Sequence, residues 1–294
     1  MVTAALDEER NEGASGALQR WPRLVWRLAL ALLVALGAWA FWLEPRSLVV
    51  HTETLDVPHW PAPLAGTRIA LLSDLHVGSP YWHVADLERL VERVNAEQPE
   101  LVLLAGDYMI NGVKLGTWVE PEAIATALGR LRAPLGVIAV LGNHDWWNDG
   151  RRVRRAFEAS GIVVLENEAR RVQRGDGGFY VVGLADELTR RVRIDRALSG
   201  VGADDPYLVL VHEPDVFPQV PEQASLTLAG HTHGGQVRLP LLGRPVIPSR
   251  HGQRYAAGHV VEDGRHLFVT TGVGTSIFPV RFGVPPELVL LTLE

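Results

Sequence analysis

The chain has 294 residues, of which 47% are hydrophobic, and a formal net charge of −6. This composition supports a large buried core in one globular domain, because α/β domains reach about 250 residues as a unit. The acidic balance argues against a nucleic-acid-binding protein, and the absence of cysteine excludes thiolate metal sites and disulfide bonds.

The N-terminal segment differs in composition from the rest of the chain. Residues 1–20 are small and polar, and we expect them to be a disordered tail. An apolar segment follows over 21–43, with tryptophans near both of its ends. Counted from Leu24, its apolar run is long enough to span a bilayer, and tryptophan favours the membrane interface. We therefore predict a transmembrane anchor or uncleaved signal at 21–43, a linker with the strand that leads into the domain at 44–66, and a globular domain at 67–294.

The charges that flank the apolar run predict its orientation. Arg20, Arg23 and Arg27 lie at its N-terminal end, where the side chain of Arg27 can extend to the interface, which places the N-terminus in the cytoplasm and the globular domain across the cell membrane on a single pass. The alternative is a cleavable signal peptide, because Ala38-Trp39-Ala40 has the small-x-small form of a cleavage site. Either alternative predicts an exported domain.

Hydrophobic periodicity divides the globular domain into two halves. The first half alternates predicted strands (68–73, 101–105, 137–141) with predicted helices (84–97, 121–132, 151–160). The second is rich in predicted strands (163–166, 170–174, 179–183, 207–211, 226–229, 266–271, 288–293). This pattern predicts two packed sheets with helices outside them.

Polar motifs follow five of these apolar runs. They are Asp74-Leu75-His76, Gly106-Asp107, Gly142-Asn143-His144-Asp145, His212 and Gly230-His231-Thr232-His233. In α/β sheets, ligand sites form beyond the carboxyl ends of the strands, so the five motifs can converge on one pocket. Each motif alone is weak evidence for a metal site, since Asp often opens a turn. All five motifs in this order are strong evidence for one. Carboxylate, amide and imidazole donors suit Mn, Fe, Zn or Mg.

This ordered set resembles the calcineurin-like metallophosphoesterase superfamily from Arg68 to the C-terminus. The segments 229–237, 271–276 and 279–287 resemble the membrane-associated YkuE/YaeI-like phosphodiesterase branch. The resemblance implies a four-layer α/β/β/α sandwich and a hydrolase with two divalent metal ions. It assigns to one ion the residues Asp74, His76, Asp107 and His233, and to the other Asp107, Asn143, His212 and His231. Asp107 would bridge them, and a bridging hydroxide would attack phosphorus.

Two further catalytic residues are expected in the third motif. His144 is not assigned to a metal, which leaves it free to protonate the leaving oxygen or to contact the phosphate. Asp145 could orient His144, or it could be the N-cap of a helix ahead of residues 146–157. Arginine and histidine side chains of an irregular flap at 234–252 and of the C-terminal tail could meet the substrate phosphate, with Arg250, His251 and Arg281 as candidates. The alternative for the flap residues is ordinary solvated loop charge.

Aromatic residues follow several of the motifs and bear on the substrate class. Tyr81, Trp82, Trp118, Trp146 and Trp147 could form a rim that contacts the membrane interface, or they could pack under loops. Together with the anchor, the rim favours a lipid-linked phosphodiester or pyrophosphate as substrate. The alternatives are a metal-dependent phosphomonoesterase or protein phosphatase, and a non-catalytic scaffold. Asp186 follows a predicted strand and could lie near the pocket.

Overall fold

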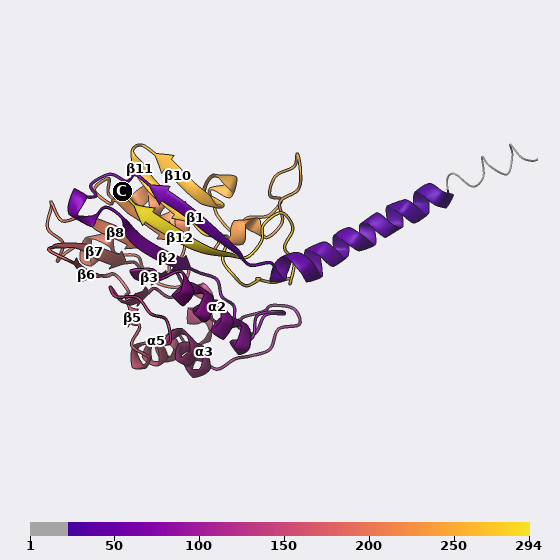
Figure 1. Cartoon of the computed structure of the whole chain (residues 1–294), viewed down its shortest axis with the longest axis horizontal. Coiled ribbons are helices and arrows are strands. Elements are labelled where there is room, and N and C mark those ends of the chain that lie inside the picture. Colours follow the sequence, from indigo (N-terminus) through magenta and orange to yellow (C-terminus); the bar gives the residue numbers. More distant parts are fainter. Residues whose placement is uncertain (1–22) are drawn as a thin grey trace, which may run out of the picture.

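Two six-stranded sheets face each other in the computed structural model, which describes residues 23–294 (Figure 1). The predicted tail at 1–20 lies outside the described residues. The first sheet has the strand order β1-β12-β2-β3-β4-β5. Its strands are β1 (Val49–Leu55), β12 (Glu287–Leu293), β2 (Thr67–Leu72), β3 (Leu101–Leu104), β4 (Val137–Ala139) and β5 (Val163–Val164).

The second sheet has the order β10-β11-β9-β8-β7-β6. Its strands are β10 (Gly258–Glu262), β11 (Arg265–Val269), β9 (Leu226–Ala229), β8 (Tyr207–Leu210), β7 (Gly177–Gly183) and β6 (Glu168–Arg174). The inner strands pair in parallel, whereas β10 and β6 pair antiparallel to their neighbours. Both sheets are therefore mixed.

The facing sides of the two sheets form the central core. In β2, Ile69 and Leu71 belong to this core, and Ala70 and Leu72 belong to the cluster on the outer face. Successive side chains of a strand point to opposite faces, and both faces of β2 are covered. This explains why the strand reads as an unbroken apolar run.

Helices cover the outer faces of both sheets. The first sheet is covered by α2 (Val84–Ala96), α3 (Pro121–Leu128) and α5 (Gly150–Ala159), whose apolar sides join its outer cluster. The second sheet is covered by shorter segments, α6 (Ile194–Ala197), η4 (Pro214–Gln219) and η6 (Gly252–Tyr255). The predicted fold of two mixed sheets between helical layers is confirmed.

Two elements differ from the sequence prediction. Strand β10 was not expected, because its short sequence follows a loop rich in glycine and proline. The helix predicted at 151–160 is α5, whereas the alternative of one helix over 146–157 is replaced by two helices, α4 (Asn143–Asn148) and α5. Asp149 separates them and caps α5, because its carboxylate accepts a hydrogen bond of 3.0 Å from the amide of Arg152.

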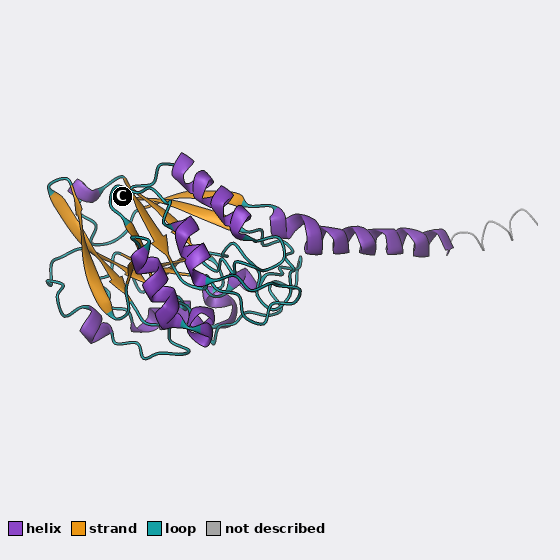
Figure 2. Cartoon of the chain, turned by 90° about the horizontal axis from the view of Figure 1, so that it is seen from below, coloured by secondary structure: helices purple, strands orange, loops and turns teal. Residues whose placement is uncertain are grey.

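An apolar helix projects from the domain at its N-terminal end (Figures 1 and 2). The segment Arg23–Arg46 spans 24 residues with a mean hydropathy of 2.0, and among the described residues it alone is long and apolar enough to cross a membrane. It ends in a π-helical turn, η1 (Trp39–Leu43), and a 3-10 turn, η2 (Glu44–Arg46). Only 6% of its most apolar stretch is buried, so it is not a core helix.

The end of this helix is fixed to the globular domain. The hydroxyl of Tyr81 donates to the carbonyl oxygen of Phe41 at 2.7 Å, and the indole of Trp82 donates to that of Pro45 at 3.2 Å. Trp82 is buried. These two aromatic residues therefore hold the junction between helix and domain and do not belong to an exposed rim.

The direction of β1 determines where the helix meets the domain. β1 runs parallel to β12, and β12 runs antiparallel to β2. The beginning of β1 therefore lies at the end of the first sheet where β2, β3 and β4 terminate. We refer to this end of the sandwich, at the carboxyl ends of these strands, as the edge that carries the polar motifs. Since β1 follows the helix closely, the helix joins the sandwich at the edge from which the polar motifs leave.

Candidate metal centre

The polar motifs of the two sheets converge at this edge. We call Asp74, His76, Asp107, Asn143, His212, His231 and His233 the ligand cluster. A distance of 3.3 Å separates His212 Nε2 from Asp107 Oδ2, and the same distance separates His233 Nε2 from Asp74 Oδ1. His231 Nδ1 lies 3.2 Å from His212 Nε2. The carboxyl ends of strands from both sheets thus bring together residues far apart in sequence.

The backbone of the ligand cluster is strained. Five of its members have positive φ: Asp74 (53°), His76 (39°), Asp107 (58°), His231 (69°) and His233 (50°). Residues other than glycine rarely adopt this conformation, and it persists where the surrounding structure enforces it, most often at functional sites. The strain therefore coincides with the predicted ligand positions.

Two glycines of the motifs are required by close approach. A Cβ atom at Gly142 would lie 2.3 Å from Asp107 Oδ1, and one at Gly230 would lie 2.5 Å from Asp74 Oδ2. No larger residue fits at either position without displacing a carboxylate of the cluster. The glycines in Gly-Asn-His-Asp and Gly-His-Thr-His therefore allow the ligand loops to pack against each other.

Burial keeps two of the imidazoles neutral. It lowers the pKa of His76 to about 3 and the pKa of His231 to about 4. A histidine binds a metal through its neutral form. Both rings are therefore in the ligand form at neutral pH.

Asp107 and His212 each stabilise the charged form of the other. Burial alone would lower the pKa of His212, but Asp107 outweighs it and raises that pKa well above its ordinary value. Burial would raise the pKa of Asp107, but His212 and its neighbours hold it well below the usual range. Asp107 is therefore ionised and supplies a negative charge at the centre of the cluster, to which a cation would be attracted.

The hydrogen bonds of the cluster fit a divalent cation. His76 Nδ1 lies 3.1 Å from the carbonyl oxygen of Met109, and His212 Nδ1 lies 2.7 Å from that of Ala105. These contacts direct Nε2 of both rings into the cluster, as backbone carbonyls that hydrogen-bond to histidine ligands do in metal sites. Within the described chain, Asp74 Oδ1 and Asn143 Oδ1 are buried without a hydrogen-bond partner. A bound cation would satisfy these oxygens.

His144 lies beside the seven residues of the ligand cluster, and with His76 and Asp107 it forms a third group of mutually close donor atoms. Its Nε2 is 3.9 Å from Asp107 Oδ2, and its ring centre is 4.8 Å from that of Trp147. Burial lowers the pKa of His144. Its buried Nδ1 has no hydrogen-bond partner among residues 23–294. The ring is therefore available to a bound ligand.

Asp145 holds the backbone of two ligand loops. Its carboxylate accepts hydrogen bonds of 2.9 to 3.0 Å from the amides of Asp107, Tyr108, Met109 and Gly142. These bonds differ from the expectation that Asp145 orients the ring of His144, whose Nδ1 it does not contact. They also place Asp145 in the first turn of α4, with Gly142 as the N-cap.

Arg281 is a structural residue, and its prediction as a substrate ligand is wrong. It is fully buried. Its guanidinium donates to five backbone carbonyl oxygens, those of Thr271, Gly272, Gly274, Val284 and Pro285. No donor remains for a phosphate. The sequence could not reveal this role, because the carbonyl groups come from a tail with no regular structure.

That C-terminal tail also supports the cluster, which sequence reasoning did not anticipate. The amide of Gly274 donates to the carbonyl oxygen of Asp74 at 2.7 Å, and the amide of Val273 donates to that of Ser73 at 3.1 Å. A Cβ atom at Gly272 would lie 2.6 Å from Cβ of Asp74. The closely spaced Gly272 and Gly274 were the sequence signal that could have indicated this close packing.

Arg250 and His251 have partners outside the ligand cluster. Arg250 is exposed and ion-paired with Glu187 and Asp215. The ring of His251 packs against that of Tyr255 at 4.8 Å. In the described part of the chain, no hydrogen bond or ion pair joins either side chain to the cluster. Their assignment to the substrate stays a prediction.

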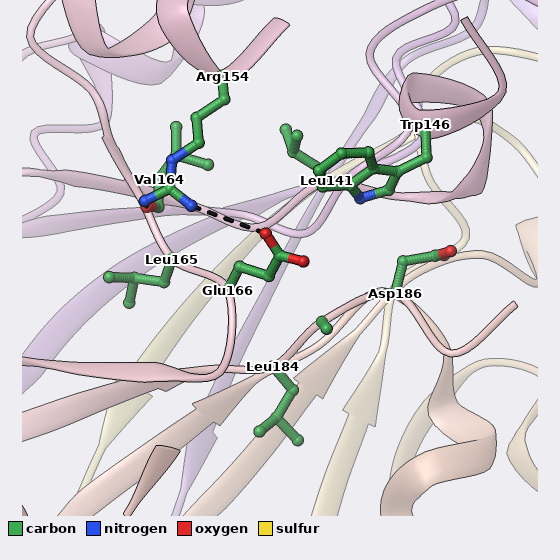
Figure 3. A pocket seen from close by; sticks show the side chains of 9 residues that line it. Leu141, Trp146, Arg154, Val164, Leu165, Glu166, Leu184 and Asp186 are labelled. Atoms are coloured by element: carbon green, nitrogen blue, oxygen red, sulfur yellow. Dashed lines mark hydrogen bonds and ion pairs between the residues drawn. The ribbon is translucent and has the colours of Figure 1, made fainter. Parts of the chain in front are cut away.

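The remaining aromatic residues separate into packed and exposed groups. Trp146 belongs to α4, and its side chain lines a pocket together with Arg154, Glu166 and Asp186 (Figure 3). Its ring packs under the guanidinium of Arg190 at 4.4 Å. Trp147 and Trp118 are about half exposed. Asp186 caps a local turn, because its carboxylate accepts a 2.7 Å hydrogen bond from the amide of Thr189.

The sequence of this chain is similar to those of known metallophosphoesterases. The family model for calcineurin-like phosphoesterases matches residues 67–235. The uncharacterized metallophosphoesterase YkuE of Bacillus subtilis is 30% identical over 91% of this chain and 93% of its own length. The phosphodiesterase YaeI of Escherichia coli is 31% identical over 77% of this chain and 82% of its own length. A transmembrane protein with a metallophosphoesterase domain from Danio rerio is 28% identical over 91% of this chain and 62% of its own length.

Proposed function

The chain belongs to the calcineurin-like phosphoesterase family, and we propose that it is a membrane-anchored phosphodiesterase with two divalent metal ions. It is a hydrolase that acts on phosphoester bonds. Its proposed substrate is a lipid-linked phosphodiester or pyrophosphate at the membrane surface.

The ligand cluster would hold both ions. Asp74, His76 and His233 form one group of mutually close donor atoms, and Asp107, His212 and His231 form another. We assign Asp107 to both ions and Asn143 to the second group. When bound, divalent ions lower the pKa of a water molecule to be used as nucleophile and offset the charge of the phosphate. Manganese, iron, zinc and magnesium all suit these donors.

His144 is proposed to act on the substrate directly. Its Nε2 lies at the edge of the cluster, and its lowered pKa makes the ring neutral at neutral pH. A neutral imidazole still donates one N–H hydrogen bond. We therefore propose that His144 donates to a phosphate oxygen or to the leaving oxygen. Asp145 is a positioning residue, since its carboxylate holds the loops that carry Asp107 and Asn143.

The observation that carries the membrane assignment is the antiparallel pairing of β12 with β2. It brings the start of β1, and with it the apolar helix, to the edge that carries the ligand cluster. An anchor at the opposite edge would hold the cluster far from the bilayer. The upstream arginines Arg20, Arg23 and Arg27 favour a domain on the extracytoplasmic side. We propose single-pass attachment to the cell membrane.

Substrate preference of the full chain tests this function. The chain in liposomes would be supplied with Mn, Zn, Fe or Mg and compared on three substrates: bis-p-nitrophenyl phosphate, p-nitrophenyl phosphate and a phospholipid diester. We expect cleavage of both diesters in preference to the monoester. Preference for the monoester would support a phosphomonoesterase. Absence of any hydrolysis with every ion, despite measured metal binding, would favour a scaffold.

A further inference from the structure

Three loops carry exposed apolar side chains at the edge of the sandwich where the apolar helix joins the domain. They cover residues 111–118, 234–254 and 274–284. Leu115 is 87% exposed, Leu241 is fully exposed, and Leu242, Ile277 and Phe278 are each more than half exposed. We call these five side chains the apolar tips. Scattered exposed leucines are normal on proteins, but a group of this size marks an interaction surface.

The backbone at three of the tips makes the choice of residue unusual. Leu115, Leu241 and Ile277 have φ angles of 63°, 67° and 61°. Glycine or asparagine ordinarily occupies such positions, and a bulky or β-branched residue there is strained. Exposure of an apolar side chain to water is unfavourable, and so is a positive φ angle at these residue types. The side chains of Leu115, Leu241 and Ile277 remain mostly exposed, so packing within the domain does not offset either cost.

Hydrogen bonds join the three loops into one surface. The amide of Lys114 donates to the carbonyl oxygen of Ile277 at 2.9 Å. The side chain of Gln236 donates to the carbonyl oxygen of Ser276 at 3.0 Å and accepts from its amide at 2.7 Å. The tips are therefore held together and do not belong to independent mobile loops.

The same surface is attached to the end of the apolar helix. The amide of Arg281 donates to the carbonyl oxygen of Ala40 at 3.0 Å, and the amide of Val284 donates to a carboxylate oxygen of Glu44 at 2.7 Å. In both views of the chain, loops cluster at the end of the domain from which the helix departs (Figures 1 and 2). A membrane crossed by the helix would thus lie next to the tips.

The charge of the loops also fits a membrane. None of the residues in the three loops is Asp or Glu, although the chain contains 34 acidic residues. Basic side chains, including Lys114, Arg238 and Arg244, stand near the tips. Basic residues next to an apolar surface attract anionic lipid headgroups.

We propose that the apolar tips insert into the headgroup region of the bilayer that the helix crosses. This second contact, which rests on the anchoring in the proposed function, holds the domain with its ligand cluster facing the lipid surface. The cluster would then meet headgroup phosphates without extracting the lipid. The ligand His233 directly precedes the loop that carries Leu241 and Leu242, which connects the tips to the cluster.

Depth measurements on the full chain test the proposal without relying on activity. The chain contains no cysteine, so a single introduced cysteine can be labelled with the environment-sensitive dye NBD. Labels would be placed at Leu242→Cys and Phe278→Cys in liposomes of phosphatidylcholine and phosphatidylglycerol. Val261→Cys is the matched control, because Val261 is also exposed but pairs with His266 at the opposite end of the second sheet. Leu33→Cys reports on the helix itself.

Nitroxide-labelled lipids then act as quenchers. We expect the labels at residues 242 and 278 to be quenched severalfold more strongly than the label at residue 261, with emission shifted to the blue. Quenching at residue 33 but not at residues 242 and 278 would overturn the proposal and leave the anchor intact. Absence of quenching at all four positions would overturn both the proposal and the anchor.

Discussion

The amide of Arg281 donates a 3.0 Å hydrogen bond to the carbonyl oxygen of Ala40, at the end of the apolar helix. The guanidinium of the same residue binds the tail segment that supports Asp74. One residue thus connects the apolar helix to the ligand cluster. The orientation of the domain relative to the apolar helix is therefore built into the fold and does not depend on a flexible linker.

Replacing Arg281 should destabilise the fold without a specific effect on substrate binding. Arg281→Leu removes a hydrogen-bond donor from five backbone carbonyl oxygens, of which only those of Gly272 and Pro285 keep another donor, and we expect a loss on the order of 3 kcal/mol or more in the free energy of unfolding. Urea unfolding and steady-state kinetics measure the two effects. Arg89→Ala, at an exposed ion pair with Asp86 on α2, serves as control. Normal stability with a raised KM in Arg281→Leu would restore its assignment to the substrate.

Asp145→Asn should weaken metal binding although Asp145 is not a ligand. Asparagine has one acceptor oxygen and turns an NH2 group towards amides that need acceptors. We expect about a 10–100-fold loss of metal affinity, as for other residues that orient ligands. Calorimetric titration with Mn or Zn measures it. Asp149→Asn, which alters only the cap of α5, should keep the affinity. Equal affinities in both variants would contradict the positioning role.

Trp147→Ala and Trp146→Ala should have different effects. Trp147 is exposed, and its removal should reduce turnover of a phospholipid diester in liposomes severalfold, with little change for bis-p-nitrophenyl phosphate. Trp146 packs under Arg190 and against Gly150, so its removal should lower the stability by about 2 kcal/mol. Equal loss of Trp147→Ala turnover on both substrates would contradict a lipid contact.

The ion pair between Glu100 and Arg174 should make the stability depend on pH. Burial works to raise the pKa of Glu100, but hydrogen bonds from Arg174 and from the amide of Arg68 outweigh it and lower that pKa below 4.5. The stabilisation is therefore complete above pH 4.5 and is lost as the pH falls through the lowered value. We expect Glu100→Gln to be less stable than the natural chain at pH 7, with a difference that shrinks in acid.

Urea unfolding of the detergent-solubilised chain across this pH range measures the effect. Glu92→Gln, on the exposed side of α2, is the control and should show no such pH dependence. A stability difference between Glu100→Gln and the natural chain that is constant from neutral to acid pH would contradict the role of the ion pair.

The sequence predicted the sheets and the ligand motifs because both are local patterns. An apolar run such as 101–105 followed by Gly-Asp already specifies a strand and the polar group at its end. The convergence of the motifs could be predicted because ligand sites of α/β sheets form beyond the carboxyl ends of the strands.

The roles of Arg281 and Asp145 were beyond sequence reasoning because their partners are backbone groups. A guanidinium surrounded by carbonyl oxygens and a carboxylate surrounded by amides leave no residue pattern to read. The pairing direction of β1 with β12 was equally hidden, because it depends on segments at opposite ends of the chain. The same holds for the apolar tips, which come from three separate loops.

The most direct test of the central claim is the metal content of the chain measured together with its turnover. The full chain would be stripped of metal, reloaded with Mn or Zn and analysed by mass spectrometry of the bound ions, with Asp107→Asn in parallel. The account predicts two ions per chain, restored diester hydrolysis, and loss of both in Asp107→Asn. Diester hydrolysis that survives complete removal of metal, or in Asp107→Asn, would contradict it.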